Sequence, residues 1–158
     1  MDDPVAQSAG RSASGRVLRF RRGYGNAVEG ELIVSAQGFN ARYDMDLQKG
    51  VFTRLGHDLH GESVKGKIFV FATPKGGIAT SWALANIRQH GLAPLALVCR
   101  RANPVVVQGA VLAGIPIADS FDLDPVESLK TGQRARLDPE QGVLTVLGPY
   151  AREFQRWA

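Results

Sequence analysis

Three short apolar runs, separated by two segments of helical spacing, constrain the fold of this chain most strongly. The runs are GKIFVFAT at 66–73, LAPLALVCR at 92–100 and IPIAD at 115–119. Continuous apolar runs of this length are typical of strands covered on both faces. Between them, 78–91 is a predicted helix that stops near Gly91, and 103–114 is a second helix that begins near Pro104. This order predicts an α/β domain with a mainly parallel central sheet and right-handed connections.

Further elements are predicted on both sides of this series. They are a strand at 28–36, strand and loop at 41–46, a turn or short helix near 124–130, and a β-hairpin at 131–147. The turn of the hairpin is DPEQG at 138–142. The C-terminal YAREFQRWA fits an amphipathic helix that packs Phe154 and Trp157. We expect residues 1–15 to be a flexible tail and residues 16–158 to form a single domain.

The composition limits the compartment and the chemistry of the chain. It has 158 residues, 44% of them hydrophobic, which is enough for one sizeable core. No apolar run approaches the roughly 20 residues of a membrane helix, and the first residues lack a secretory apolar segment, so we expect a cytoplasmic protein. Cys99 is the only cysteine, which excludes an internal disulfide and a cysteine-rich metal site made by this chain alone. Its apolar neighbours favour a small core residue over a nucleophile.

The net charge of +4 comes mostly from the N-terminus, where residues 1–23 carry five arginines against two aspartates. Arg19, Arg21 and Arg22 form a cluster that can contact phosphates. The cluster matches no nucleic-acid-binding module and has few interleaved aromatic residues. A solvated basic leader is therefore the favoured interpretation, and a nucleic-acid partner is not expected.

The turn TPKGG at 73–77, between a predicted buried strand and a predicted helix, is the first candidate site. Its glycines allow close approach of a ligand, Lys75 adds a cation, and a helix N-terminus favours an anion. Thr80 and Ser81 follow in the first turn of the helix. The alternative is a tight structural turn in which Thr80 caps the helix. The segment lacks the residue order of a nucleotide-binding P-loop.

The polar loop 54–63 is the second candidate. His57 and His60 are three residues apart, but an irregular loop fixes no shared metal geometry and no third ligand is identifiable, so a hydrogen-bonded loop is favoured. His57 can still line a pocket. The polar residues of RYDMD at 42–46 fit carboxylate binding or proton transfer, and equally a surface strand edge. Asn103 is best explained as a helix cap.

Four separated segments carry a family resemblance. They are GHDLHGESVKGKIFVF, PKGGIATS, APLALVCRRANPVVVQGAVLAGIPIAD and LKTGQRARLD. In their order and spacing, over about residues 30–146, they resemble the small-subunit or swivelling domain of the aconitase X family. The resemblance implies a swivelling β/β/α domain that closes over a larger catalytic subunit. The predicted fold is accordingly α/β, with a mainly parallel central sheet and additional β-hairpins.

Members of this family are hydro-lyases. The archaeal kind is similar to phosphomevalonate dehydratase, and bacterial relatives include cis-3-hydroxy-L-proline dehydratases. The resemblance implies an iron or iron–sulfur centre held mainly by the large subunit, with no metal ligand from this chain. We expect a large catalytic subunit as the partner and inactivity without it.

The resemblance also suggests roles for individual residues. The expected substrate-binding residues are Lys75, Gly76, Gly77 and His57. The archaeal pattern has a serine, the proposed proton acceptor, at the position of Gly77, so Thr80 and Ser81 are the remaining hydroxyl candidates for catalysis. This departure favours a small hydroxy acid such as cis-3-hydroxy-L-proline over phosphomevalonate. A stand-alone module for small anions and a basic interaction protein are the alternatives from other functional classes.

Overall fold

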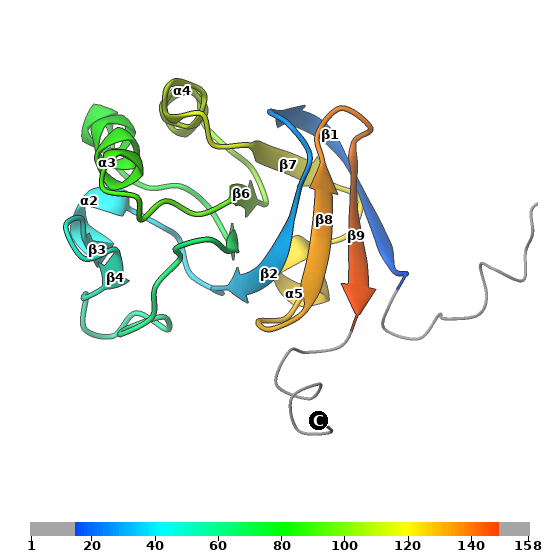
Figure 1. Ribbon diagram of the computed structural model, residues 1–158, viewed down its shortest axis with the longest axis horizontal. Helices are drawn as coiled ribbons and strands as arrows, with labels where there is room; N and C mark the ends of the chain where they lie inside the picture. The colour runs from blue at the N-terminus through cyan, green and yellow to red at the C-terminus, as the bar shows by residue number, and fades with distance from the viewer. Residues whose placement is uncertain (1–14, 149–158) are drawn as a thin grey trace, which may run out of the picture.

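A closed barrel forms the frame of the molecule (Figure 1), whose computed structural model describes residues 15–148. Its strand order is β1-β7-β6-β5-β2-β8-β9. The strands are β1 (Val17–Tyr24), β2 (Val28–Val34), β5 (Ile68–Phe71), β6 (Ala96–Cys99), β7 (Ile117–Phe121), β8 (Arg134–Asp138) and β9 (Val143–Gly148). Closure leaves the barrel without a free edge strand, which would be a template for aggregation.

The parallel part of the barrel confirms the predicted strand and helix series. β2, β5, β6 and β7 are consecutive parallel neighbours. The helix α3 (Ile78–Gln89) connects β5 to β6, and α4 (Pro104–Ala113) connects β6 to β7. The two helices pack against each other and cover the outer face of these strands (Figure 1). Every residue of β5 and of β6 is buried, as continuous apolar runs require.

The prediction of a mainly parallel sheet was wrong for the rest of the barrel, which makes the sheet mixed. β1 pairs antiparallel with β7 and β9, and β8 pairs antiparallel with β2 and β9. The predicted hairpin at 131–147 is confirmed as β8 and β9. β1 was missed because three of its exposed positions are arginines, whereas Leu18 and Phe20 are buried in the barrel core. Much of the supposed basic leader is therefore a barrel strand.

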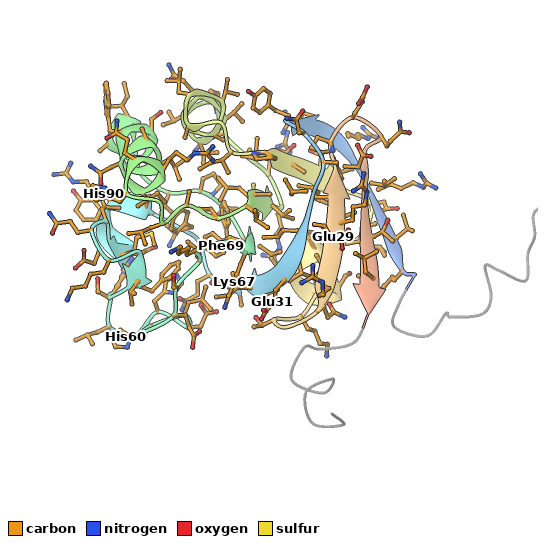
Figure 2. The ribbon with its side chains drawn as sticks, viewed as in Figure 1. Glu29, Glu31, His60, Lys67, Phe69 and His90 are labelled. Carbon is orange, nitrogen blue, oxygen red and sulfur yellow. The ribbon has the colours of Figure 1, made fainter. Side chains whose placement is uncertain are left out.

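Two hydrophobic clusters lie on the two faces of the parallel strands. One fills the barrel and includes Leu18, Val70 and Leu144. The other lies between the barrel and the helices and includes Leu84. Phe69 belongs to this second cluster and lies in the interior of the molecule (Figure 2).

The remaining elements are short and lie in the connections. They are α2 (Ala41–Asp44), β3 (Met45–Asp46), β4 (Val51–Phe52) and α5 (Pro125–Ser128). The strand and loop predicted at 41–46 are thus largely a helical turn, because the Asn40 side chain caps it. None of the helices within residues 15–148 has the length and apolar character that a bilayer crossing requires. The predicted helix with Phe154 and Trp157, and nearly all of the predicted tail, lie outside the described residues.

Candidate active site at the carboxyl edge of the parallel strands

The turn 73–77 is held at the carboxyl ends of the parallel strands by the segment that follows β2. The Phe39 N–H donates to the Thr73 carbonyl over 2.9 Å, and the Lys75 N–H donates to the Phe39 carbonyl over 2.8 Å. These bonds extend the pairing of β2 with β5 beyond the strands themselves. The predicted ligand-binding turn is therefore fixed to the segment after β2 at the carboxyl ends of the parallel strands, the end at which α/β proteins commonly bind ligands.

The two glycines of the turn have different roles. Gly76 has a φ of +96°, and a Cβ there would lie 2.7 Å from Asn40 Nδ2 and 2.8 Å from Thr80 Oγ1. Gly77 precedes α3 as its N-cap, and a Cβ there would meet nothing within 4 Å. No side chain caps α3, and the Thr80 N–H donates to the Gly77 carbonyl over 2.9 Å, so the N–H groups of Ile78 and Ala79 are the ones available to an anion. Gly76 is needed by the turn, and Gly77 leaves the helix start open.

Thr80 and Ser81 lie inside the structure. Thr80 is 2% exposed, and its hydroxyl donates to the Lys75 carbonyl over 3.2 Å. It closes the turn. The structural alternative was therefore right about a tight turn but wrong about Thr80 as the helix cap. Ser81 is 9% exposed and faces α4, where a Cβ on Gly109 would lie 3.0 Å from Ser81 Oγ. The structure thus brings both hydroxyls near the turn, each on a largely buried residue.

A polar pocket of about 310 Å³ opens beside the turn. Its lining residues are Gln37, Gly38, Arg54, Leu55, Gly56, His57 and Lys75. They come from the segment after β2, from the loop 54–63 and from the turn itself, so the structure joins the two candidate sites into one. Two of the side chains are cations and none is a carboxylate. The pocket suits a carboxylate or phosphate group of a ligand.

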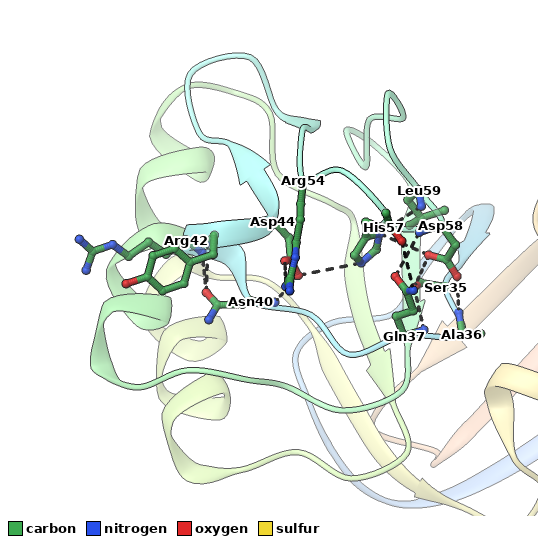
Figure 3. A network of polar contacts seen from close by, with 12 residues as sticks. Ser35, Ala36, Gln37, Asn40, Arg42, Asp44, Arg54, His57, Asp58 and Leu59 are labelled. Atoms are coloured by element: carbon green, nitrogen blue, oxygen red, sulfur yellow. Dashed lines mark hydrogen bonds and ion pairs between the residues drawn. The ribbon is translucent and has the colours of Figure 1, made fainter.

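Arg54 is oriented by Asp44, a residue that is 1% exposed. Asp44 accepts a hydrogen bond from Arg54 Nη1 over 3.0 Å and another from the Asn40 N–H over 2.8 Å (Figure 3). A buried carboxylate that is paired and hydrogen-bonded in this way holds its partner in a fixed direction. The sequence placed Arg54 in the candidate loop 54–63 and Asp44 in the polar stretch 42–46, but it did not predict that Asp44 supports Arg54.

His57 is a buried residue of the pocket wall, and its side chain is 3% exposed. Its ring stacks on Phe52 with the centroids 4.8 Å apart, and Nδ1 accepts a hydrogen bond from the Leu59 N–H. Nε2 lies 3.9 Å from Asp44 Oδ2. Within residues 15–148, it is the buried side-chain polar atom that has no hydrogen-bond partner. The polar network in Figure 3 therefore contains one unused donor or acceptor beside the pocket.

The loop 54–63 is a hydrogen-bonded loop, as predicted. Asp58 accepts hydrogen bonds from the Ser35 hydroxyl over 2.7 Å and from the Ala36 N–H over 2.8 Å, which fastens the loop to the end of β2. His60 is exposed at the outer end of this loop (Figure 2), whereas His57 is buried, so the two histidines share no metal geometry. Within the described part of the chain, no three His, Cys, Asp or Glu side chains are placed to hold a metal ion.

The iron or iron–sulfur centre implied by the family resemblance does not fit the side chains described in residues 15–148. Cys99 is fully buried in β6, and burial raises the pKa of its thiol to about 12. A thiol with such a pKa does not offer the thiolate that iron–sulfur ligation requires. Cys99 is therefore a core residue, as the sequence indicated.

Two further polar candidates have structural roles. Asn103 caps α4 by accepting a hydrogen bond from the Val106 N–H over 2.9 Å, which confirms the capping interpretation. Arg42 and Tyr43 are exposed on α2, where the guanidinium lies 5.4 Å from the Tyr43 ring centroid. They belong to a helical turn and not to a strand edge, because Asn40 starts the helix here.

The sequences of several known proteins align with most of this chain. A phosphomevalonate dehydratase small subunit from Thermococcus gammatolerans is 37% identical over 130 residues, which are 82% of this chain and 97% of that protein. The protein of the same name from Methanosarcina acetivorans is 31% identical, over 81% of this chain and 89% of that protein.

Solved structures and a family model agree with these sequence matches. The crystal structure of Thermococcus kodakaraensis aconitase X in its holo-form superposes with a TM-score of 0.80 at 33% identity, covering 85% of this chain and 100% of that chain. The solution structure of a UPF0107 protein gives a TM-score of 0.74 at 28% identity, covering 83% of this chain and 99% of that one. The family model of the aconitase X swivel domain matches residues 17–146. The chain described here therefore belongs to the aconitase X swivel domain family.

Proposed function

We propose that this chain is the small subunit of a two-chain dehydratase, a hydro-lyase of the aconitase X type, and that it is inactive without its large subunit. The observation that carries the proposal is the pocket lined by Arg54 and Lys75, which lies beside the turn 73–77 at the carboxyl ends of the parallel strands. The chain also matches a dehydratase small subunit over nearly the whole length of that protein. One wall of a shared active site is what such an edge is suited to supply.

In this proposal the chain's own residues bind and orient the substrate. Lys75 and Arg54 attract a carboxylate or phosphate into the pocket, and Asp44 keeps Arg54 pointed at it. The uncapped start of α3 at Gly77 offers N–H groups to a substrate oxygen. Any iron or iron–sulfur centre belongs to the large subunit. A role of Thr80 or Ser81 as proton acceptor stays a prediction.

Phosphomevalonate is the first candidate substrate, because the curated relatives named above carry that activity in their names. The second candidate is cis-3-hydroxy-L-proline. It is favoured by Gly77, which occupies the position where the archaeal pattern, by resemblance, has a serine. Both molecules carry an anionic group that suits the pocket.

The test is to co-express this chain with a large subunit of the aconitase X type and to assay the purified complex anaerobically on both substrates. We expect turnover of one of them only when both chains are present. A chain that neither binds the large subunit nor changes its activity would contradict the proposal. A complex active on cis-3-hydroxy-L-proline alone would replace the first candidate with the second.

A further inference from the structure

Two large apolar side chains stand in solvent at the start of α3. Ile78 is 68% exposed and Trp82 is 73% exposed. They are four residues apart, so they lie on the same helix face. Within α3 the one charged side chain is Arg88, in its last turn, so the face around Ile78 and Trp82 carries no charge. An exposed tryptophan of this kind usually marks a contact surface, because tryptophan is enriched among the residues that dominate binding energy.

More exposed apolar side chains flank the pocket. Leu55, which is 84% exposed, lines the same pocket as Lys75. Tyr43 is 66% exposed on α2, which packs against α3 (Figure 1). Ile78 directly follows Gly77 in the chain. We call these four residues, Tyr43, Leu55, Ile78 and Trp82, the edge patch. Leu55 belongs to the pocket wall, and Ile78 lies at the start of α3, next to the turn 73–77.

We propose that the edge patch is the surface covered by the large subunit, with Trp82 as its main anchor. This inference rests on the proposed function. A polar pocket that forms half of an active site has to be closed against bulk water by the other half. Apolar side chains around its rim provide that seal, and burial of a tryptophan adds large contact area at a small entropy cost.

The location of the edge patch favours the large subunit as its binding partner. Leu55 lines the pocket, Ile78 directly follows the turn 73–77, and Trp82 shares the helix face of Ile78, so a partner that closes the pocket also meets this face of α3. Leu112 is equally apolar and 74% exposed, but it lies in the last turn of α4, a helix that runs away from this edge toward the start of β7. Nonspecific hydrophobic association would involve Leu112 as much as Trp82, whereas binding of the large subunit over the pocket is expected to involve Trp82 and not Leu112.

The experiment compares full-length variants in their affinity for the purified large subunit, measured by titration calorimetry. Trp82→Ala is expected to weaken binding on the order of 30-fold or more, and Ile78→Ala by a smaller factor. Leu112→Ala is the matched control and is expected to bind like the wild type. Because Trp82 is exposed, its removal should leave the circular dichroism and the thermal midpoint of the free chain unchanged.

The outcomes separate this inference from the proposed function. If the wild type and Trp82→Ala bind the large subunit equally well, the inference about the edge patch is wrong, while the proposed function stands. Equal weakening by Trp82→Ala and Leu112→Ala would also overturn the patch. If light scattering shows that the free chain forms a dimer that Trp82→Ala dissolves, a second copy is the occupant and the inference fails. If the wild type does not bind the large subunit at all, the proposed function fails and the inference with it.

Discussion

The parallel part of the barrel buries both faces of its strands, whereas the antiparallel part buries only one. In β5 and β6 every side chain is buried, because the helices cover one face and the barrel interior the other. In β8 the pattern alternates: Ala135 and Leu137 are buried, whereas Arg134 and Arg136 are exposed. Within residues 15–148 the long helices α3 and α4 cover the parallel strands and lie away from β8 and β9 (Figure 1), which explains the different burial.

This contrast also separates function from support. The turn 73–77, the pocket and the edge patch belong to the connections of the parallel strands, where chain crossovers bring loops to one edge. β1, β8 and β9 close the barrel. Arginines occupy exposed positions of β1 and β8, whereas β9 has no charged residue and is partly exposed at Val143 and Thr145. The antiparallel part therefore stabilises the frame on which the parallel part presents its site.

The largest expected effect on stability comes from a core residue of the parallel strands, whose two faces are both covered. Phe69 is fully buried and contacts the rings of Phe39, Phe52 and Phe71 at centroid distances of 4.9, 5.6 and 4.9 Å. Phe69→Ala should lower the free energy of unfolding by about 3–5 kcal/mol, measured by urea denaturation. Phe20→Ala on β1, where the side chain is 8% exposed, should cost less. Equal losses would mean that the two parts are packed alike.

The next effect concerns the turn. Gly76→Ala places a Cβ against Asn40 and Thr80 in a backbone conformation that suits glycine, and should cost roughly 1–3 kcal/mol of unfolding free energy. Gly77→Ala is the matched control, because its Cβ would enter open space. Thermal unfolding of both variants measures the difference. If Gly77→Ala were the more damaging change for the isolated chain, the roles assigned to the two glycines would be reversed.

Thr80 distinguishes a structural hydroxyl from a catalytic one. Thr80→Ala removes the bond to the Lys75 carbonyl and should cost about 1 kcal/mol. The catalytic role predicted for Thr80 and Ser81 is tested by the turnover of the assembled enzyme with Thr80→Ala and with Ser81→Ala. Thr80→Ser is the control that keeps the hydroxyl, and a purely structural role should leave turnover within about tenfold. A fall on the order of 10² or more in either alanine variant would identify that residue as the proton acceptor.

The smallest effect is a pH dependence at the same edge. Arg100, which follows β6, hydrogen-bonds Asp124 and lowers the pKa of its carboxyl below the ordinary value of 3.8. The charged carboxylate therefore stabilises the folded state above about pH 4, and this contribution is lost as the pH falls toward the lowered pKa. Because the pair is partly exposed, we expect only a few tenths of a kcal/mol.

Asp124→Asn tests this effect, because the amide oxygen can still cap α5 as the carboxylate does. Unfolding midpoints of wild type and variant should differ at pH 6 and converge toward pH 3. A difference that does not depend on pH would show that the ion pair contributes nothing.

The sequence predicted the parallel part well, because a strand covered on both faces is a continuous apolar run and needs no knowledge of its partner. The antiparallel closure was missed for two physical reasons. The arginines of β1 hide its alternation, and the pairing of Arg22 with Asp119, at 2.6 Å, joins residues far apart in the chain. No local pattern encodes such a contact.

Only part of the candidate site could be predicted from the sequence. The glycine turn and His57 were found from local chemistry. Arg54 was placed in the candidate loop 54–63, but its role in the pocket was not predictable, because its direction depends on the ion pair with buried Asp44. The solvent exposure of Ile78 and Trp82 was also not predictable, because both have the helical spacing of core residues.

Hydrogen exchange of this chain, measured by mass spectrometry with and without the large subunit, tests the central claim most directly. The account predicts slower exchange at the carboxyl edge, in peptides covering 36–57 and 73–82, and unchanged exchange in β8 and β9. Protection concentrated on β8 and β9, with the turn 73–77 left unprotected in the complex, would contradict it.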